Sequence, residues 1–237
     1  MVRAGFVTGL AVEAGVLRRH AASHDPAIAL MIACAGADAL RARQLAEDLL
    51  EAGAGALVSF GIAGGLDPAL TPGDTVLPEA VVALDGMAVA TDAAWRRRVL
   101  DLAAAKGLRP TGGRLVGSDQ VVATVAGKRA LFETSRAVAV DMESHAVALA
   151  AQAAGVPFLV VRAVIDPADR ALPKAVHGSI APDGRARKGL VTTRLVLRPW
   201  EAPQVNRLRQ DTGAALRALG KLTRAIGPVL TTYPRGP

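Results

Sequence analysis

Two short segments of this sequence place acidic side chains directly after a predicted strand. Asp141 and Glu143 follow a β-branched run, and Asp166 follows a run that is nearly all apolar. Carboxylates held at such places can donate or accept a proton in a reaction. Each acid also has a structural explanation, because acids cap helices and Asp166 before Pro167 fits a turn at a strand end. The residues alone leave both explanations open.

The elements around these acids are predicted to bring them together. Residues 138–140 indicate a strand, Asp141 occupies the N-cap position of a following helix, and residues 158–165 indicate a strand buried on both faces. The apolar face expected for this helix contains Met142, Ala146, Leu149 and Ala153. The resulting βαβ unit would deliver Glu143 and Asp166 to the same edge of the sheet, where ligands bind in open α/β sheets.

Strands and helices are predicted to alternate in the N-terminal part of the chain. The expected strands are residues 4–8, 27–35 and 56–60. Glu13 lies early in the helix after the first strand, where an acid is by default solvated, and Gly36 precedes an amphipathic helix over residues 38–50. The third strand leads into SFGIAGGLDPALTPGDTVLP, which predicts a loop whose glycines let backbone N–H groups approach a ligand. It is not a P-loop, because no Gly-Lys-Ser/Thr follows.

The C-terminal part is predicted to end in a long helix. Two strand segments around Pro78 are expected in residues 75–89, followed by a helix over residues 93–106, a strand, and the segment GSDQVVAT at residues 117–124. Residues 172–189 indicate a surface loop. The final helix has an apolar stripe of Leu208, Ala215, Leu219, Leu222 and Ile226. Its other side carries Arg217, Lys221 and Arg224, by default a solvated face and alternatively one that contacts an anionic membrane surface.

Composition restricts the class of protein. The 237 residues are 51% hydrophobic and 21% charged, which excludes a disordered chain, and only 3% are aromatic, which argues against nucleic-acid stacking. The single cysteine, Cys34, is expected in a buried strand, and the four histidines show no metal spacing, so we expect no metal. No signal peptide or transmembrane helix is evident, and we expect a cytoplasmic protein.

Charge is distributed unevenly along the chain. Between Arg185 and Arg224 there are ten Lys or Arg residues but only two acids, Glu201 and Asp211. We expect one domain over residues 1–237, with this basic helical segment from about residue 185.

Four motifs together resemble one known family. They are VDMES, VVRAVIDPAD, GFVTGLAVEAGVL, and the glycine signature formed by Gly61, Gly64, Gly65, Leu66, Gly73 and Asp74. The chain resembles the nucleoside phosphorylase and nucleosidase superfamily over roughly residues 2–170, and above all its methylthioadenosine/S-adenosylhomocysteine nucleosidases. The resemblance implies a single-domain, three-layer α/β/α fold around a central mixed, twisted sheet, with no cofactor.

The resemblance also assigns roles to the acids. Asp166 is implied to donate a proton to the purine N7, and burial would keep it protonated for this task. Glu143 would accept hydrogen bonds from the ribose 2′ and 3′ hydroxyls, with Met142 packed under the sugar. Glu13 would deprotonate a water on the opposite face, a division of labour between carboxylates that glycosidases also use.

Further substrate contacts follow from the same resemblance. Relatives hold the purine with a segment corresponding to residues 117–124, in which Val121 stands where an aromatic ring usually stacks and Val122 would supply backbone hydrogen bonds. Gly64 and Gly36 are also expected to contact the substrate. The sequence departs from the family at Val121, and at Ile165, where a serine usually precedes the catalytic Asp.

Two further points concern the nucleophile, which could be water or phosphate, and the subfamily whose substrate this chain would share. Glu13 in the water-activating place would repel phosphate, which favours hydrolysis, whereas Arg162 occurs in nucleosidases as well and does not discriminate. The tail, LPKA…GRARKGLVTTRLVLRPW…LRQDTGAALRALGKL, resembles the hopanoid-associated phosphorylase subfamily, which implies release of adenine from adenosylhopane. A lipid 5′ group calls for an open apolar exit, and a basic face suits a peripheral contact with the inner side of an anionic membrane.

Relatives are homodimers whose neighbouring chain walls the 5′ pocket, so a homodimer is expected. Three alternatives stay open: an ordinary methylthioadenosine/S-adenosylhomocysteine nucleosidase, a phosphate-dependent phosphorylase, and a catalytically silent nucleoside- or lipid-binding protein. No nucleic-acid partner is expected, because the basic excess lies on one tail that lacks interleaved aromatics.

Overall fold

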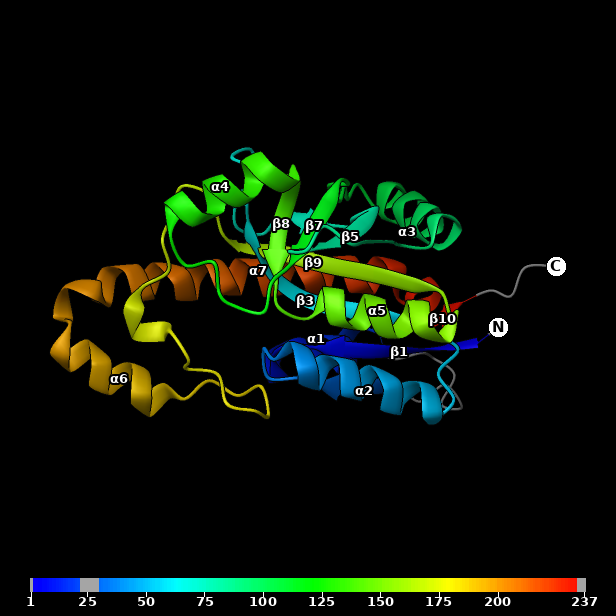
Figure 1. The fold of residues 1–237 in the computed structure, drawn as a ribbon, viewed down its shortest axis with the longest axis horizontal. Helices are drawn as coiled ribbons and strands as arrows, with labels where there is room; N and C mark the ends of the chain where they lie inside the picture. Colours follow the sequence, from blue (N-terminus) through cyan, green and yellow to red (C-terminus); the bar gives the residue numbers. More distant parts are fainter. Residues whose placement is uncertain (1, 22–29, 234–237) are drawn as a thin grey trace.

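The structure is a computed structural model that describes residues 2–21 and 30–233 (Figure 1). Its strands are β1 (Val2–Thr8), β2 (Met31–Cys34), β3 (Ala56–Gly65), β4 (Thr75–Val76), β5 (Ala80–Ala83), β6 (Ala88–Ala90), β7 (Arg114–Gly117), β8 (Ala137–Asp141), β9 (Phe158–Asp166) and β10 (Thr232–Tyr233). Its α-helices are α1 (Ala11–His20), α2 (Ala39–Glu51), α3 (Ala93–Ala105), α4 (Val125–Ser135), α5 (Ser144–Ala154), α6 (Lys188–Leu197) and α7 (Ala202–Thr231). Two short 3₁₀ helices, η1 (Lys174–Val176) and η2 (Pro199–Glu201), flank α6.

The strands form one curled, mixed sheet. Its main order is β10-β1-β3-β8-β7-β5-β6, with β2 paired to β1, and β9 paired to both β3 and β4. β3 pairs in parallel with β1 at its N-terminal end and with β9 along most of its length, and it pairs antiparallel with β8 at its C-terminal end. β3 is therefore the strand against which the acid-bearing segments are aligned.

Helices cover both faces of this sheet, as Figure 1 shows. On one face, α2 and α5 pack through Leu49 and Val147 into a core with Leu57 and Val160 of the strands. On the other face, α1, α3 and α7 pack in a second core whose members include Leu17, Val99, Leu219, Phe6 and Val58. The predicted three-layer α/β/α fold with a mixed sheet is confirmed. The assignment of all 237 residues to one domain stays a prediction.

Several predicted elements are confirmed with shifted ends. The helices expected over residues 38–50 and 93–106 are α2 and α3, and the carboxylates of Asp38 and Asp92 cap them. β2 occupies only part of the strand expected over residues 27–35, and positions 27–29 lie outside the described residues. Residues 75–89 contain parts of three short strands rather than two, because β5 and β6 form an antiparallel hairpin.

The apolar stripe of the last helix is also confirmed. In α7, Ala215, Leu219, Leu222 and Ile226 are buried, and Leu208 is half-buried at the edge of a cavity described below. The opposite side of α7, which carries Arg217, Lys221 and Arg224, is exposed. None of the helices among the described residues is long and apolar enough to cross a membrane.

The glycine-rich segment after the third strand is a loop only in its second part: residues 66–74 lie between strands as predicted, whereas Gly61 to Gly65 continue the third strand. β3 runs on through Gly61 to Gly65 and keeps pairing with β9. The reason is steric: these glycines lie in extended backbone, and their missing side chains leave room for charged groups from neighbouring elements.

The central βαβ unit differs from its prediction in two ways. Asp141 is the last residue of β8 and pairs with Gly117 of β7, so the N-cap position falls on Glu143, although Asp141 Oδ1 still accepts a hydrogen bond from Ser144 N at the start of α5. β8 and β9 do not form a parallel pair either, since they lie against β3 in opposite directions. Glu143 and Asp166 consequently lie at two levels along β3.

The buried face of α5 also differs from the predicted stripe. Ala146 is buried as expected, but Met142 and Leu149 are half-buried and Ala153 is exposed. The buried residues of α5 are Ser144, Ala146, Val147, Ala148, Ala150 and Ala151. These small side chains let the helix approach the sheet closely. The buried face is therefore determined by residue size and not by the spacing of apolar residues that predicted it.

Candidate active site

A fully buried guanidinium, that of Arg162 on β9, lies at the centre of the acidic cluster. One of its nitrogens, Nη2, contacts Asp141 Oδ2 at 2.5 Å and Glu143 Oε2 at 3.3 Å. The same nitrogen donates to Ser59 Oγ at 2.7 Å and to Ser144 Oγ at 3.1 Å. A buried arginine needs such partners, because an unpaired charge in the interior is costly.

Glu13 joins the same cluster from α1. It is buried, with 1% of its surface exposed, so it is not the solvated acid of the default explanation. Its Oε2 accepts a hydrogen bond from Leu10 N and its Oε1 accepts one from Ile62 N, both at 2.8 Å. Glu13 therefore ties the start of α1 to β3 just beyond the point where β1 ends.

Two carboxylates of this cluster, those of Glu13 and Glu143, hold their protons more tightly than usual. Burial raises the pKa of Glu13, against the opposing effect of the Arg162 charge. Burial likewise raises the pKa of Glu143 to about 8, with Arg162 opposing and Asp141 and Glu13 adding to the rise. Burial works against the charged form of Arg162 too, but the surrounding carboxylates outweigh it and the pKa of Arg162 is raised. Glu143 is therefore mainly protonated at neutral pH.

Two glycines make the cluster possible. A Cβ on Gly61 would lie 2.5 Å from Arg162 Nη1 and 2.5 Å from Glu13 Oε1, and one on Gly9 would overlap the carboxylate of Glu143. Such distances are far inside van der Waals contact, so a side chain at either place would displace the charged groups. The glycines of the sequence signature thus make space for protein side chains.

Asp166 lies further along β3, beside Gly64, with which it pairs. A Cβ on Gly64 would lie 3.4 Å from its Oδ1. Gly61 and Gly64 are three residues apart, which places Asp166 roughly 10 Å along the strand from the Arg162 cluster. This is the length scale of one nucleoside.

A buried lysine that the sequence reasoning missed holds Asp166. Lys128 Nζ of α4 is ion-paired with Asp166 Oδ2 and also donates to the backbone oxygens of Pro167 and Arg170, each at 2.9 Å. Burial raises the pKa of Asp166 to about 6, and Lys128 limits the rise. The pKa of this carboxyl group is therefore raised, as expected, but by less than the pKa of an isolated buried acid would be.

The segment expected to hold the base lies next to Asp166. Leu172 N donates to Ala123 O at 2.8 Å, which fastens residues 117–124 to the segment after β9. Val122 packs partly buried against Leu66 and Val140, whereas Val121 is half-exposed. The roles of these two valines stay predictions.

Of the remaining residues predicted to contact the substrate, Gly64 and Met142 lie near the acids and Gly36 does not. Gly64 lies beside Asp166 and Met142 is half-buried between Asp141 and Glu143 in the chain. Gly36 has a positive φ of 73°, and a Cβ there would meet the carbonyl oxygens of Ala181 and Pro182. The structure thus places Gly36 under the segment before α6, and not in the carboxylate cluster.

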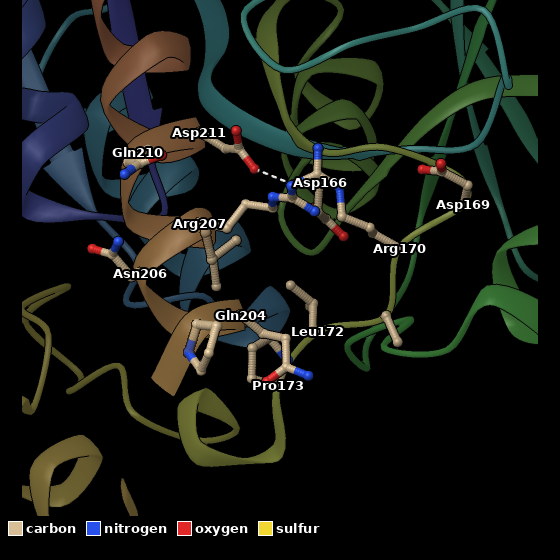
Figure 2. Close-up of a pocket in the computed structure, with 13 residues that line it drawn as sticks. Asp166, Asp169, Arg170, Leu172, Pro173, Gln204, Asn206, Arg207, Gln210 and Asp211 are labelled. Carbon is tan, nitrogen blue, oxygen red and sulfur yellow. Dashed lines mark hydrogen bonds and ion pairs between the residues drawn. The ribbon is translucent and has the colours of Figure 1, made fainter. Parts of the chain in front are cut away.

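An open cavity of about 620 Å³ adjoins Asp166 (Figure 2). It lies between the segment after β9 and the first turns of α7, and Arg170 and Asp211 form an ion pair of 2.5 Å across it. Most of its lining side chains are polar: Asp166, Asp169, Arg170, Gln204, Asn206, Arg207, Gln210 and Asp211. Leu172, Pro173, Pro203 and Leu208 are among its apolar residues, so the lining is mixed, polar and apolar.

The arrangement suits chemistry that uses carboxylates without a metal. Within the described residues no cluster of three or more His, Cys, Asp and Glu could hold a metal ion, and a guanidinium already occupies the centre of the acidic cluster. Nη1 and Nε of Arg162 are buried and have no hydrogen-bond partner within the described part of the chain. A polar ligand atom or a water near Glu13 would satisfy them.

Sequence reasoning missed Lys128 and the ionic role of Asp141. A signal existed for Lys128, because it precedes Leu131 and Phe132 by three and four residues and so shares the core-facing side of α4. A lysine on such a face is almost never buried without a charged partner. No comparable signal distinguished Asp141 from an ordinary helix cap.

Comparisons with known proteins identify the family and the fold. The chain matches the model of the family described as the phosphorylase superfamily over residues 21–196. No curated protein sequence gives a significant match. Similar solved structures include 5′-methylthioadenosine/S-adenosylhomocysteine nucleosidase from Neisseria meningitidis, with 19% identity and a TM-score of 0.68 over 94% of this chain and 99% of that one.

Two Helicobacter pylori proteins are similar in the same way. Its 5′-methylthioadenosine/S-adenosylhomocysteine nucleosidase has 17% identity and a TM-score of 0.68 over 94% of this chain and 98% of that one. A mutant of its futalosine hydrolase has 16% identity and a TM-score of 0.66 over 94% and 99%. These structures share the fold, and the family model covers most of the sequence. The chain therefore belongs to the phosphorylase superfamily.

Proposed function

We propose that the protein is a purine nucleosidase that cleaves the N-glycosidic bond of an adenosyl nucleoside. The observation that carries this proposal is that the acids lie at two separate positions along β3. Glu13 and Glu143 surround the buried Arg162 at the level of Gly61, while Asp166 lies beside Gly64. One nucleoside would span these two positions, with its sugar near the first group and its base near Asp166.

The leaving base needs a proton. When the N9–C1′ bond breaks, its electron pair passes to the purine, and Asp166 would give a proton to N7. With a pKa of about 6, a fraction of roughly one tenth of Asp166 is protonated at pH 7, enough for a general acid because proton transfer is fast relative to turnover. Each tenfold in rate corresponds to about 1.4 kcal/mol of barrier.

The sugar and the nucleophile would be served by the Arg162 cluster. Glu143 would exchange its contact with Arg162 for the ribose hydroxyls, with Met142 beside the sugar. Glu13 would take a proton from a water that also satisfies the unpartnered N–H groups of Arg162. Three carboxyl groups face a single guanidinium, which leaves no excess of positive charge to hold a phosphate dianion and supports hydrolysis over phosphorolysis.

We propose adenosylhopane as the substrate, with the lipid on the ribose 5′ carbon. Support comes from the resemblance of the C-terminal tail and from an exposed surface on the arm formed by α6 and η2. Val196, Leu197 and Trp200 are all more than 60% exposed there, beside a run of basic residues. We propose further that the protein is a homodimer in which the partner completes the 5′ side. Methylthioadenosine is the second candidate substrate, favoured by the fold shared with its nucleosidases.

The test is chromatographic detection of free adenine in phosphate-free buffer. Adenosylhopane in detergent and methylthioadenosine are offered in parallel. Adenine from adenosylhopane alone would support the lipid substrate, and rapid release from methylthioadenosine would move the protein to the small-metabolite branch. Release that begins only when phosphate is added would overturn hydrolysis, and no release from any nucleoside under either condition would indicate a binding protein.

A further inference from the structure

The ammonium of Lys128 makes an unusually complete set of contacts for a residue outside the acidic cluster. Its side chain has no exposed surface, and Nζ faces the Oδ2 and backbone oxygen of Asp166 together with the backbone oxygens of Pro167 and Arg170. Two of these acceptors belong to Asp166, the last residue of β9, and two belong to the turn that follows it. Lys128 therefore holds this turn and the side chain of Asp166 as one unit.

These contacts treat the two oxygens of Asp166 differently. Oδ2 accepts from Lys128, whereas within the described residues Oδ1 accepts no hydrogen bond from another residue; a Cβ on Gly64 would lie 3.4 Å from Oδ1 and 3.6 Å from Oδ2. The carboxyl group also borders the cavity, while only 8% of its side chain is exposed. The fixed oxygen and the free oxygen are thus set by the position of Lys128.

We propose that Lys128 is a positioning residue for the general acid: it fixes Oδ2 of Asp166 and leaves Oδ1 as the oxygen that delivers the proton. This inference rests on the proposed nucleosidase function. When the proton moves from Oδ1 to the purine N7, Asp166 becomes a carboxylate that is already paired with the Lys128 ammonium. The charge that develops on Asp166 as the bond breaks is therefore stabilised by a preorganised cation.

Lys128 would also set the pH range of the reaction. Removing its charge should raise the pKa of Asp166 further, because an opposite charge in contact lowers a carboxyl pKa by about 1 to 3 units. The other charges that face Asp166 are Arg170, on its own segment, and the cavity groups Asp169, Arg207 and Asp211. Since Arg170 is engaged by Asp211, Lys128 is the cation in direct contact with the acid.

The first experiment compares Lys128→Gln with Lys128→Arg. Gln keeps N–H donors for the turn but removes the charge, whereas Arg keeps both. The pKa of Asp166, measured from its ¹³Cγ NMR signal, should rise by about 1 to 3 units in Lys128→Gln and stay near the wild-type value in Lys128→Arg. The high-pH limb of kcat/KM should move by the same amount, and kcat should fall at least roughly tenfold with little change in KM.

The control is Lys106→Met, on the exposed residue that caps the end of α3, which should leave both readouts unchanged. If Lys128→Gln lowers activity and stability while the pKa and the pH limb stay in place, Lys128 has only a structural role and the proposal is wrong. Should that variant not fold, the wild-type ¹⁵Nζ signal of Lys128 decides. Its chemical shift must change as Asp166 titrates, and this change must be absent in Asp166→Asn. A ¹⁵Nζ chemical shift that does not follow the titration of Asp166 would overturn the proposal.

The two proposals fail in different ways. A wild-type protein that releases no base from any nucleoside contradicts the nucleosidase function, whereas the NMR titrations still show whether Lys128 controls Asp166. Base release that is normal in wild type, with an unchanged pH limb in Lys128→Gln, contradicts the positioning role alone.

Discussion

At the scale of single residues, the site combines acids whose pKa values are raised to different degrees. Burial raises the pKa of Glu143 to about 8 and that of Asp166 to about 6, and the difference reflects the surroundings. Glu143 shares one guanidinium with two other carboxylates, whereas Asp166 has the Lys128 ammonium to itself. Groups whose pKa values are separated in this way suit different roles in one reaction.

Asp166→Asn should abolish the proton donor while keeping the shape of the side chain. We expect kcat for base release to fall by about 100-fold or more near pH 5, where Asp166 is largely protonated, and the difference from wild type to narrow as the pH rises through about 6 and wild type loses the same proton. Steady-state kinetics between pH 5 and 9, with binding of an uncleavable nucleoside as the control for site integrity, measure the effect. A variant with wild-type kcat at pH 5 would remove Asp166 from the mechanism.

Glu143 should make the protein less stable at high pH. Its folded pKa of about 8 lies above the unfolded value of 4.5, so the native state binds the proton more tightly. The stability that this proton contributes is complete below pH 4.5 and is lost as the pH rises through about 8. Glu143→Gln, which cannot ionise, should therefore be more stable than wild type at pH 9 by on the order of 1 kcal/mol or more, and similar to it at pH 5.

Urea unfolding at the two pH values measures this difference. Glu47→Gln on the exposed side of α2 is the matched control and should stay within about 0.5 kcal/mol of wild type at both. Equal stability of Glu143→Gln and wild type at pH 9 would mean that Glu143 is ionised there without cost.

At the scale of elements, β3 organises the site through its glycines. Gly61→Ala should be destabilising by about 1 to 3 kcal/mol, because the added Cβ would lie 2.5 Å from both Arg162 Nη1 and Glu13 Oε1. Base release should fall with it, since both charged groups must move. Gly189→Ala in α6 is the control: nothing lies within 4 Å of its Cβ, and alanine favours a helix.

Thermal unfolding and the adenine assay, applied to both variants, test this prediction. A Gly61→Ala protein with unchanged stability and activity would show that the charged cluster has room to rearrange and that the glycine serves another purpose.

Some of these elements were predictable from the sequence and others were not. Periodicity and capping residues located α2, α3 and the stripe of α7, because those signals are local. The extension of β3 through Gly61 to Gly65 was not predictable in the same way, since the cause is a pair of charged side chains from α1 and β9. The acids Glu13, Glu143 and Asp166 were found through the family motifs, whereas Lys128 becomes recognisable only when α4 is seen against β9.

At the scale of the whole molecule, one part of the chain extends beyond the layered core. α6 lies at the end of the molecule opposite the described chain ends, and none of its residues is buried (Figure 1). Arg194 and Glu201 fix the arm, because Arg194 donates to His177 O and Glu201 Oε2 accepts from Ala175 N. The arm is therefore an ordered surface that presents Val196, Leu197 and Trp200 to its surroundings.

Charge favours an anionic lipid surface as the partner of this arm. Arg185, Arg187 and Lys188 are exposed at the start of α6, and the acid Asp183 is their nearest counter-charge in sequence. A second copy that used the same surface in a twofold contact would bring these cations against their own equivalents. An anionic bilayer would instead attract them and accept Trp200 at the level of its headgroups.

We expect the protein to co-sediment with vesicles of phosphatidylglycerol and phosphatidylcholine, and not with pure phosphatidylcholine. The combined change Val196→Ser and Trp200→Ser should lower the bound fraction by about tenfold, because it removes the two large apolar contacts while keeping the charge. Leu84→Ser, at an apolar residue equally exposed on the β5–β6 hairpin, should bind as wild type does. Added salt should weaken binding of all three proteins, since the attraction is partly electrostatic. If the wild type ignores anionic vesicles while the double variant dissociates a dimer in sedimentation equilibrium, the arm contacts a second copy and the lipid proposal is wrong.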